Sequence, residues 1–99
     1  MTQGVVSTPN DDRYNLQIAR SAGVAISEVL PEKIALAVFE FITGPLLENP
    51  QRVGKPLRAP LAPAFSARRG SYRVLYLIDE ASRTVKVTAV AHRGDAYHS

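Results

Sequence analysis

Residues 65–79 read FSARRGSYRVLYLID, and this stretch decides the fold because two β-prone runs flank a short turn signal. Tyrosine, valine, leucine and isoleucine dominate 72–78, and these residue types favour a half-buried pleated strand. Arg69-Gly70-Ser71 separates this run from a second expected strand over 64–69, and glycine allows the backbone geometry of a tight turn. We therefore predict a β-hairpin that turns at Gly70.

Two further strands are expected on either side of this hairpin. After a turn over 79–83, residues 84–91 place Thr84, Lys86 and Thr88 on one face and Val85, Val87 and Ala89 on the other. Near the start of the chain, 14–19 shows the same period of two, with Tyr, Leu and Ile at alternate positions.

Two helices are expected between the first strand and the hairpin. Residues 21–30 favour a first helix, and Pro31 is suited to the first position of a second one. In this second helix Ile34, Val38 and Phe41 share one face and form a core stripe. Thr43-Gly44-Pro45 ends the helix, and 46–48 is expected to add one turn.

The segment 49–63 is rich in proline and basic residues, so we predict a connection that proline orders without strand pairing. The predicted order is β-α-α-β-β-β. It indicates an α+β fold in which two N-terminal helices pack on a mainly antiparallel four-stranded sheet, with strands paired in sequence order. We expect a flexible tail over 1–13 and a single domain over 14–99.

Composition narrows the classes of function. The 99-residue chain is 45% hydrophobic and 21% charged, which is ordinary for a globular domain, and it has no cysteine for disulfides or thiolate metal sites. Its two histidines, six residues apart, make a poor metal site, so we expect neither a metal nor a cofactor. Neither a signal peptide nor a membrane-spanning run is apparent, and we predict a cytoplasmic protein without membrane contact.

Charge is distributed unevenly along the chain. Residues 1–50 hold three basic and six acidic side chains, whereas residues 51–99 hold nine basic and three acidic ones, seven of the nine being arginines. Arginine grips phosphate through two parallel hydrogen bonds and stacks on bases, so the second half favours a nucleic-acid partner. The alternative is a solvated basic face that binds no partner.

The common phosphate-loop, zinc-hydrolase and serine-hydrolase motifs are absent from the sequence. What remains is a basic and aromatic cluster that strand pairing would gather in a concavity: Arg68 or Arg69 at the end of one strand, Arg73 at the start of the next, and His92 and Arg93 after the last. Such a set is suited to cleaving RNA without metal, because a base takes the 2′-hydroxyl proton, arginine stabilises the phosphorane and an acid protonates the leaving oxygen.

Each of these residues also has a structural alternative. Arg73 can emerge at a strand edge and pair with Asp79 or Glu80. His92 can be a surface histidine at a strand end, with Tyr97 packing as a lid.

In order, the strings PEKIALAVFEFI, GPLLENPQRVGKPLR, FSARRGSYRVLYLID and AHRGDAY resemble the RelE/ParE toxin superfamily, and are most similar to actinobacterial RelE-type toxins. The resemblance implies a RelE-like domain that enters the ribosomal decoding site and cleaves messenger RNA there without metal. It also implies an acidic RelB-like antitoxin as partner, with operator DNA bound only by the toxin-antitoxin complex.

The resemblance assigns roles to individual residues. Arg73 corresponds to the arginine that contacts the scissile phosphate, Arg68 to a further phosphate contact and Tyr97 to the tyrosine that orients the substrate base. Relatives place lysines where this chain has Ala64 and Ser66, so either His92 or Lys55 would have to supply the base. Expected RNA or ribosome contacts are Arg52, Lys55, Arg58, Arg69 and Arg93.

Two other functions fit the same resemblance. ParE-type relatives poison DNA gyrase by binding the protein, and they need no phosphate-cleaving set. A toxin with weak activity would serve mainly as co-repressor of its own operon, together with the antitoxin.

Overall fold

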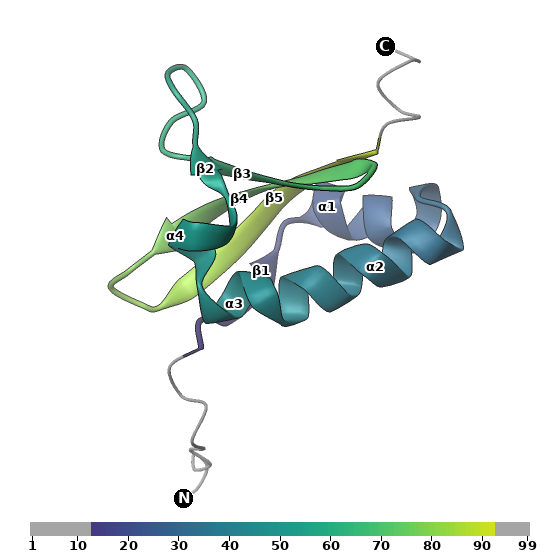
Figure 1. Ribbon diagram of the computed structural model, residues 1–99, viewed down its shortest axis with the longest axis horizontal. Helices are drawn as coiled ribbons and strands as arrows, with labels where there is room; N and C mark the ends of the chain where they lie inside the picture. Colours follow the sequence, from purple (N-terminus) through teal and green to yellow (C-terminus); the bar gives the residue numbers. More distant parts are fainter. Residues whose placement is uncertain (1–12, 93–99) are drawn as a thin grey trace, which may run out of the picture.

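The computed structural model describes residues 13–92, which form one mixed sheet and a layer of helices (Figure 1). Arg93 and Tyr97 of the expected site, and nearly all of the expected tail, lie outside these residues. In chain order the elements are β1 Asn15–Ile18, α1 Arg20–Val24, the π-helix η1 Ala25–Val29, α2 Glu32–Thr43, α3 Pro45–Glu48, α4 Pro50–Val53, β2 Lys55–Pro56, β3 Phe65–Arg69, β4 Tyr72–Asp79 and β5 Thr84–His92.

The sheet has five strands in the order β1-β5-β4-β3-β2, and the predicted four-stranded sheet paired in sequence order is wrong. The hairpin and the last strand do form an antiparallel meander. The first strand, however, lies parallel to β5 at the outer edge, with Leu16 beside Val85. Alternation in a sequence predicts which side of a strand is buried, but it does not specify the neighbouring strand.

The helices α1, η1 and α2 cover one face of the sheet (Figure 1). Along β4, Tyr72, Val74 and Tyr76 are buried toward this layer, whereas Arg73 is exposed on the opposite side. Val38 and Phe41 of α2 are buried and Ile34 packs against them, which confirms the predicted helical stripe. The sheet therefore keeps a second, open face, which carries Ser66, Arg68, Arg73, Leu75, Leu77 and Lys86.

The proline-rich segment is more regular than predicted. Pro50–Val53 forms a helical turn, and Lys55 and Pro56 pair with Ser66 and Phe65 as an edge strand. Pairing continues at Leu57, whose amide donates to the carbonyl of Ala64 at 2.9 Å. Proline therefore limits the segment's backbone, but hydrogen bonds to β3 also order it.

Smaller differences concern the N-terminal half. Arg13, assigned to the flexible tail, donates from a guanidinium nitrogen to the Thr43 carbonyl at 2.7 Å. The first predicted helix is a short α-helix that widens into η1, where the Leu30 amide donates to the Ala25 carbonyl five residues back. The second helix begins at Glu32, one residue after the predicted Pro31, and the predicted extra turn is α3.

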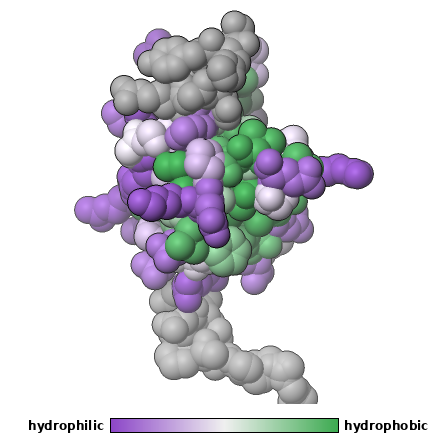
Figure 2. All heavy atoms as spheres, turned by 90° about the vertical axis from the view of Figure 1, so that its right-hand side faces the viewer, coloured by the Kyte–Doolittle hydropathy of each residue, from purple (hydrophilic) through white to green (hydrophobic). Residues whose placement is uncertain are grey.

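Apolar side chains also reach the surface. Figure 2 shows them gathered on the side of the molecule where α2 begins. Large exposed apolar residues of the helical layer are Val24, Val29, Leu36 and Phe39. In the described part of the chain, no helix has the length and apolar character needed to cross a membrane.

Candidate RNA-binding site

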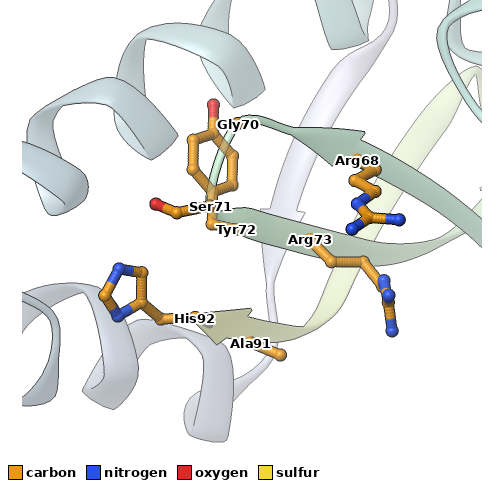
Figure 3. Close-up of a pocket in the computed structure, with 7 residues that line it drawn as sticks. All are labelled: Arg68, Gly70, Ser71, Tyr72, Arg73, Ala91 and His92. Atoms are coloured by element: carbon orange, nitrogen blue, oxygen red, sulfur yellow. The ribbon is translucent and has the colours of Figure 1, made fainter. Parts of the chain in front are cut away.

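A pocket of about 180 Å³ lies where the β3–β4 turn meets the end of β5 (Figure 3). Its lining joins the turn to three strands and comprises Arg68, Gly70, Ser71, Tyr72, Arg73, Ala91 and His92. Three residues expected from the sequence, Arg68, Arg73 and His92, are thus brought together. Ser71 was not expected there, because nothing in the sequence marks this turn residue as more than a linker.

The two arginines face each other across the hairpin. Arg68 of β3 is the register partner of Arg73 of β4, and paired residues project from the same face of a sheet. Both residues are exposed, and Figure 3 shows their guanidinium groups extending to the same side. Gly70 makes this pairing possible, because the two-residue turn takes it to a φ of +55°, which L side chains rarely adopt.

His92 enters the pocket from the other side of the sheet. Its register partner is Tyr72, whose hydroxyl donates to the Ala37 carbonyl of α2 at 3.3 Å. Figure 3 shows the rings of Tyr72 and His92 directed away from the two guanidinium groups. The pocket therefore spans the end of the sheet, with arginines on the open face and imidazole on the helical side.

An irregularity in β5 sets this placement. Tyr76 pairs with Val87 but Leu75 pairs with Ala89, so Thr88 is the extra residue of a β-bulge. Its hydroxyl donates to the Leu75 carbonyl at 3.3 Å. The bulge reverses the alternation, so Ala89 lies on the open face and not beside Val85 and Val87 as predicted. The same reversal moves His92 to the helical side.

The other expected contacts divide between the two faces. Lys55 is paired with Ser66 and lies on the open face, one row of residues away from the arginine pair. Arg69 is on the helical side, where its guanidinium lies 4.7 Å from the centre of the Phe41 ring. Arg52 is exposed on α4, and Arg58 is exposed in the loop between β2 and β3.

The alternative in which Arg73 pairs with Asp79 or Glu80 is wrong. Asp79 lies six positions beyond Arg73 on β4, a distance of about 20 Å along an extended strand. Glu80 accepts hydrogen bonds from the Tyr14 hydroxyl at 2.8 Å and from the Gln51 amide. The Asp79 carboxylate caps its own turn by accepting the Ala81 amide at 3.0 Å.

Lys86 is a basic residue of the open face that the sequence interpretation passed over. It pairs with Leu77 and is exposed. The alternation of 84–88 did predict that Lys86 meets solvent, but only the strand order shows that it shares a face with Arg73. Within residues 13–92, no three histidine or acidic side chains are grouped so as to hold a metal ion.

Burial also sets the protonation of the Tyr72 hydroxyl, on the helical side of the pocket. Removal from water raises the pKa of Tyr72, and the positive charge of Arg69 opposes this shift only in part. Tyr72 is therefore a neutral hydrogen-bond donor at physiological pH. The pocket places two adjacent guanidinium groups on the open face, where they are suited to binding a phosphate diester, and an imidazole and a neutral phenol on the helical side.

The family model for the ParE toxin of type II toxin-antitoxin systems matches residues 24–97. The chain belongs to this toxin family. The residues that match the family model include α2, the hairpin and the pocket of this toxin, and they extend beyond the described residues.

Among curated proteins the toxin is similar to the RelE type. It is 47% identical over 88 residues to Toxin RelE of Mycobacterium tuberculosis, covering 89% of this chain and 90% of the relative. It is 56% identical over 68 residues to Toxin RelG of the same organism, covering 69% of this chain and 78% of the relative.

Solved structures agree with this assignment. The crystal structure of the toxin-antitoxin complex RelBE2 from M. tuberculosis contains a chain 47% identical to the toxin, with a TM-score of 0.78 over 82% of this chain and 99% of that one. The isolated Escherichia coli RelE toxin is 19% identical with a TM-score of 0.66, covering 86% of this chain and 92% of that one, and shares the fold.

Proposed function

We propose that the toxin is a ribosome-dependent endoribonuclease that cuts messenger RNA in the cytoplasm without a metal ion. The observation that carries the proposal is the pairing of Arg68 with Arg73 on the open face. Like charges directly opposite each other in a sheet destabilise it, so this pair is best explained by an anionic ligand. A phosphate diester between the two guanidinium groups relieves their repulsion and accepts their hydrogen bonds.

The chemistry follows from this binding mode. The ribose 2′-oxygen attacks the adjacent phosphorus while its proton passes to a base, and the bond from phosphorus to the 5′-oxygen breaks. The leaving 5′-oxygen takes a proton from an acid, so the products are a 2′,3′-cyclic phosphate and a 5′-hydroxyl. Arg68 and Arg73 are suited to stabilise the extra negative charge of the pentavalent intermediate.

We assign the proton transfer to His92, which lines the same pocket as the two arginines. Histidine is the side chain most suited to exchange protons at neutral pH. Its position on the helical side means that the RNA must bend around the end of the sheet to meet both groups. Tyr97, which lies outside the described residues, is proposed to orient the substrate base.

The partners follow from the family and from charge. Chains similar to the toxin crystallise as the complex RelBE2 in M. tuberculosis and as an archaeal RelE–RelB complex in Pyrococcus horikoshii. We propose a RelB-like antitoxin for this toxin, acidic because the open face is basic. Operator DNA is then bound by the complex.

The test is cell-free translation of a defined message with purified toxin, followed by mapping of the new 5′-ends. If the proposal is right, the message is cut inside codons held at the decoding site. These cuts require ribosomes, and they persist when a chelator is added. Accumulation of relaxed plasmid DNA, with intact message, would instead indicate the gyrase poison of ParE-type relatives. Intact message and unaltered DNA topology would leave the toxin as a nucleic-acid-binding co-repressor.

A further inference from the structure

The edge strand β2 is only two residues long, yet it places Lys55 on the open face beside Ser66. By strand geometry, the Lys55 backbone lies about 10 Å across the sheet from β4 and about 7 Å along it from Arg73. An extended lysine side chain covers much of this separation. Lys55 therefore comes within reach of the phosphate next to the one held by the arginine pair.

Tyr76 and Gly54 hold β2 in place, although neither contributes a side chain to the open face. Tyr76 of β4 is fully buried and its hydroxyl donates to the Pro50 carbonyl at 2.6 Å, which ties α4 to the sheet. Its ring stacks on Phe65 of β3, with ring centres 5.6 Å apart. The Tyr76 side chain thus connects β3, β4 and the helical turn that precedes β2.

Gly54 is the point of closest approach. A Cβ atom at this position would collide with the Tyr76 hydroxyl and would lie 2.9 Å from the Ser66 carbonyl oxygen. Only a residue without a side chain allows the chain to pass directly over Tyr76 and then pair with β3 at Lys55. Together the Tyr76 hydroxyl, the Pro50 carbonyl and Gly54 form what we call the Tyr76 lock.

Burial keeps the Tyr76 hydroxyl protonated, so that it stays a hydrogen-bond donor. Removal from water raises the pKa of Tyr76 to about 12, with Arg69 opposing the shift. The hydroxyl therefore keeps its proton throughout the physiological range, and the bond to Pro50 does not depend on pH there.

We propose that Tyr76 and Gly54 are positioning residues of the toxin, and that they hold Lys55 where its ammonium group contacts an RNA backbone phosphate beside the arginine pair. The proposal rests on the proposed function, since it requires that the open face binds RNA. It adds a cation to the phosphate contacts of Arg68 and Arg73 and explains how a two-residue strand presents it.

The experiment measures binding of a short single-stranded RNA at several salt concentrations. Each phosphate contact to single-stranded nucleic acid contributes about 0.7 to the slope of log affinity against log salt. We expect Lys55→Ala to reduce the steepness of this slope by about 0.7. Tyr76→Phe should reduce the steepness by a similar amount, with the fold retained. When Tyr76→Phe is added to Lys55→Ala, the slope should become no shallower. Lys55→Arg, which keeps the positive charge, should have the wild-type slope.

The control is Thr43→Val, which also removes a hydroxyl that donates to a backbone carbonyl, here that of Phe39 at 2.7 Å, but within α2 and away from α4 and β2. It should leave the slope unchanged. An unchanged slope in Tyr76→Phe, or a further decrease when it is added to Lys55→Ala, overturns the positioning role. Failure of the wild-type toxin to bind RNA also overturns this inference, whereas the proposed function is tested separately by message cleavage in cell-free translation.

A second measurement needs no variant. Chemical acetylation of the wild-type toxin, with and without the RNA, should show Lys55 protected at least about fivefold. Lys33, exposed on α2 in the helical layer, is the internal reference and should react equally in both samples. Equal reactivity of Lys55 with and without bound RNA overturns the inference while leaving RNA binding itself established.

Discussion

Arg68 and Arg73 are register partners across the β3–β4 hairpin, and their guanidinium groups extend from the same face of the sheet. The sheet gains nothing from placing two like charges in this relationship, because directly opposed like charges are destabilising. The pair is therefore best understood as a ligand site held at a small cost in stability. This opposition of folding and binding leads to the first prediction.

Arg73→Ala should reduce RNA cleavage by about 10²–10³-fold, the loss typical of removing one donor that stabilises transition-state charge. The same change should leave the melting temperature unchanged or slightly raised, because it removes repulsion and no core contact. Message cleavage in cell-free translation and thermal unfolding measure the two effects.

Arg20→Ala is the matched control for this variant, since Arg20 is an exposed arginine of α1 in the helical layer. It should retain wild-type cleavage. Wild-type growth arrest by Arg73→Ala, at equal expression, would remove the assigned role.

His92→Gln should lower cleavage at least about 10²-fold while RNA affinity stays close to that of the wild type, because proton transfer contributes to the rate and glutamine keeps hydrogen-bonding capacity. Single-turnover cleavage and equilibrium binding separate the two quantities. Unchanged cleavage would make His92 a structural residue at the strand end and would leave Lys55 as the candidate base.

Gly70→Ala should destabilise the toxin by about 1–2 kcal/mol, the cost of a left-handed backbone for an L side chain. A Cβ atom at Gly70 meets nothing within 4 Å, so the effect is conformational and not steric. Gly70→Asn should recover most of the loss, because asparagine tolerates this conformation. Chemical denaturation measures both free energies of unfolding, and equal destabilisation by the two residues would contradict the explanation.

Features that depend on interactions between near neighbours in the sequence can be predicted from it, whereas features that depend on distant residues cannot. The hairpin at Gly70 and the stripe of Val38 and Phe41 were predictable, since each depends on neighbours a few residues apart. The position of β1 beside β5 was not, because pairing across seventy residues leaves no local signal. The bulge at Thr88 was also hidden, and it decides the side from which His92 enters the pocket.

Alkaline pH should weaken the fold through Tyr76. Its pKa is raised from 10.0 to about 12, so the folded state holds the hydroxyl proton more tightly than the unfolded chain. The resulting stabilisation is complete below pH 10 and is lost as pH rises toward 12. Urea denaturation at several pH values should show this decrease, and Tyr76→Phe should make it shallower. Parallel curves for the two proteins would contradict the assignment.

The antitoxin should protect the open face. Residues 51–99 carry nine basic and three acidic side chains, and a RelB-like partner gains affinity and association rate by matching this excess with carboxylates. Amide hydrogen exchange on the co-purified complex should therefore show slower exchange in 65–73 than in the free toxin, or changed exchange in the segment after His92 if the antitoxin displaces it. Raising the salt concentration should speed dissociation, because screening weakens contacts between exposed charges. The amides of helix α1 provide the reference, and their exchange should be the same in the complex and in the free toxin. A complex that leaves both the hairpin and the C-terminal segment as exposed as in the free toxin would show that neutralisation does not proceed by covering the RNA site.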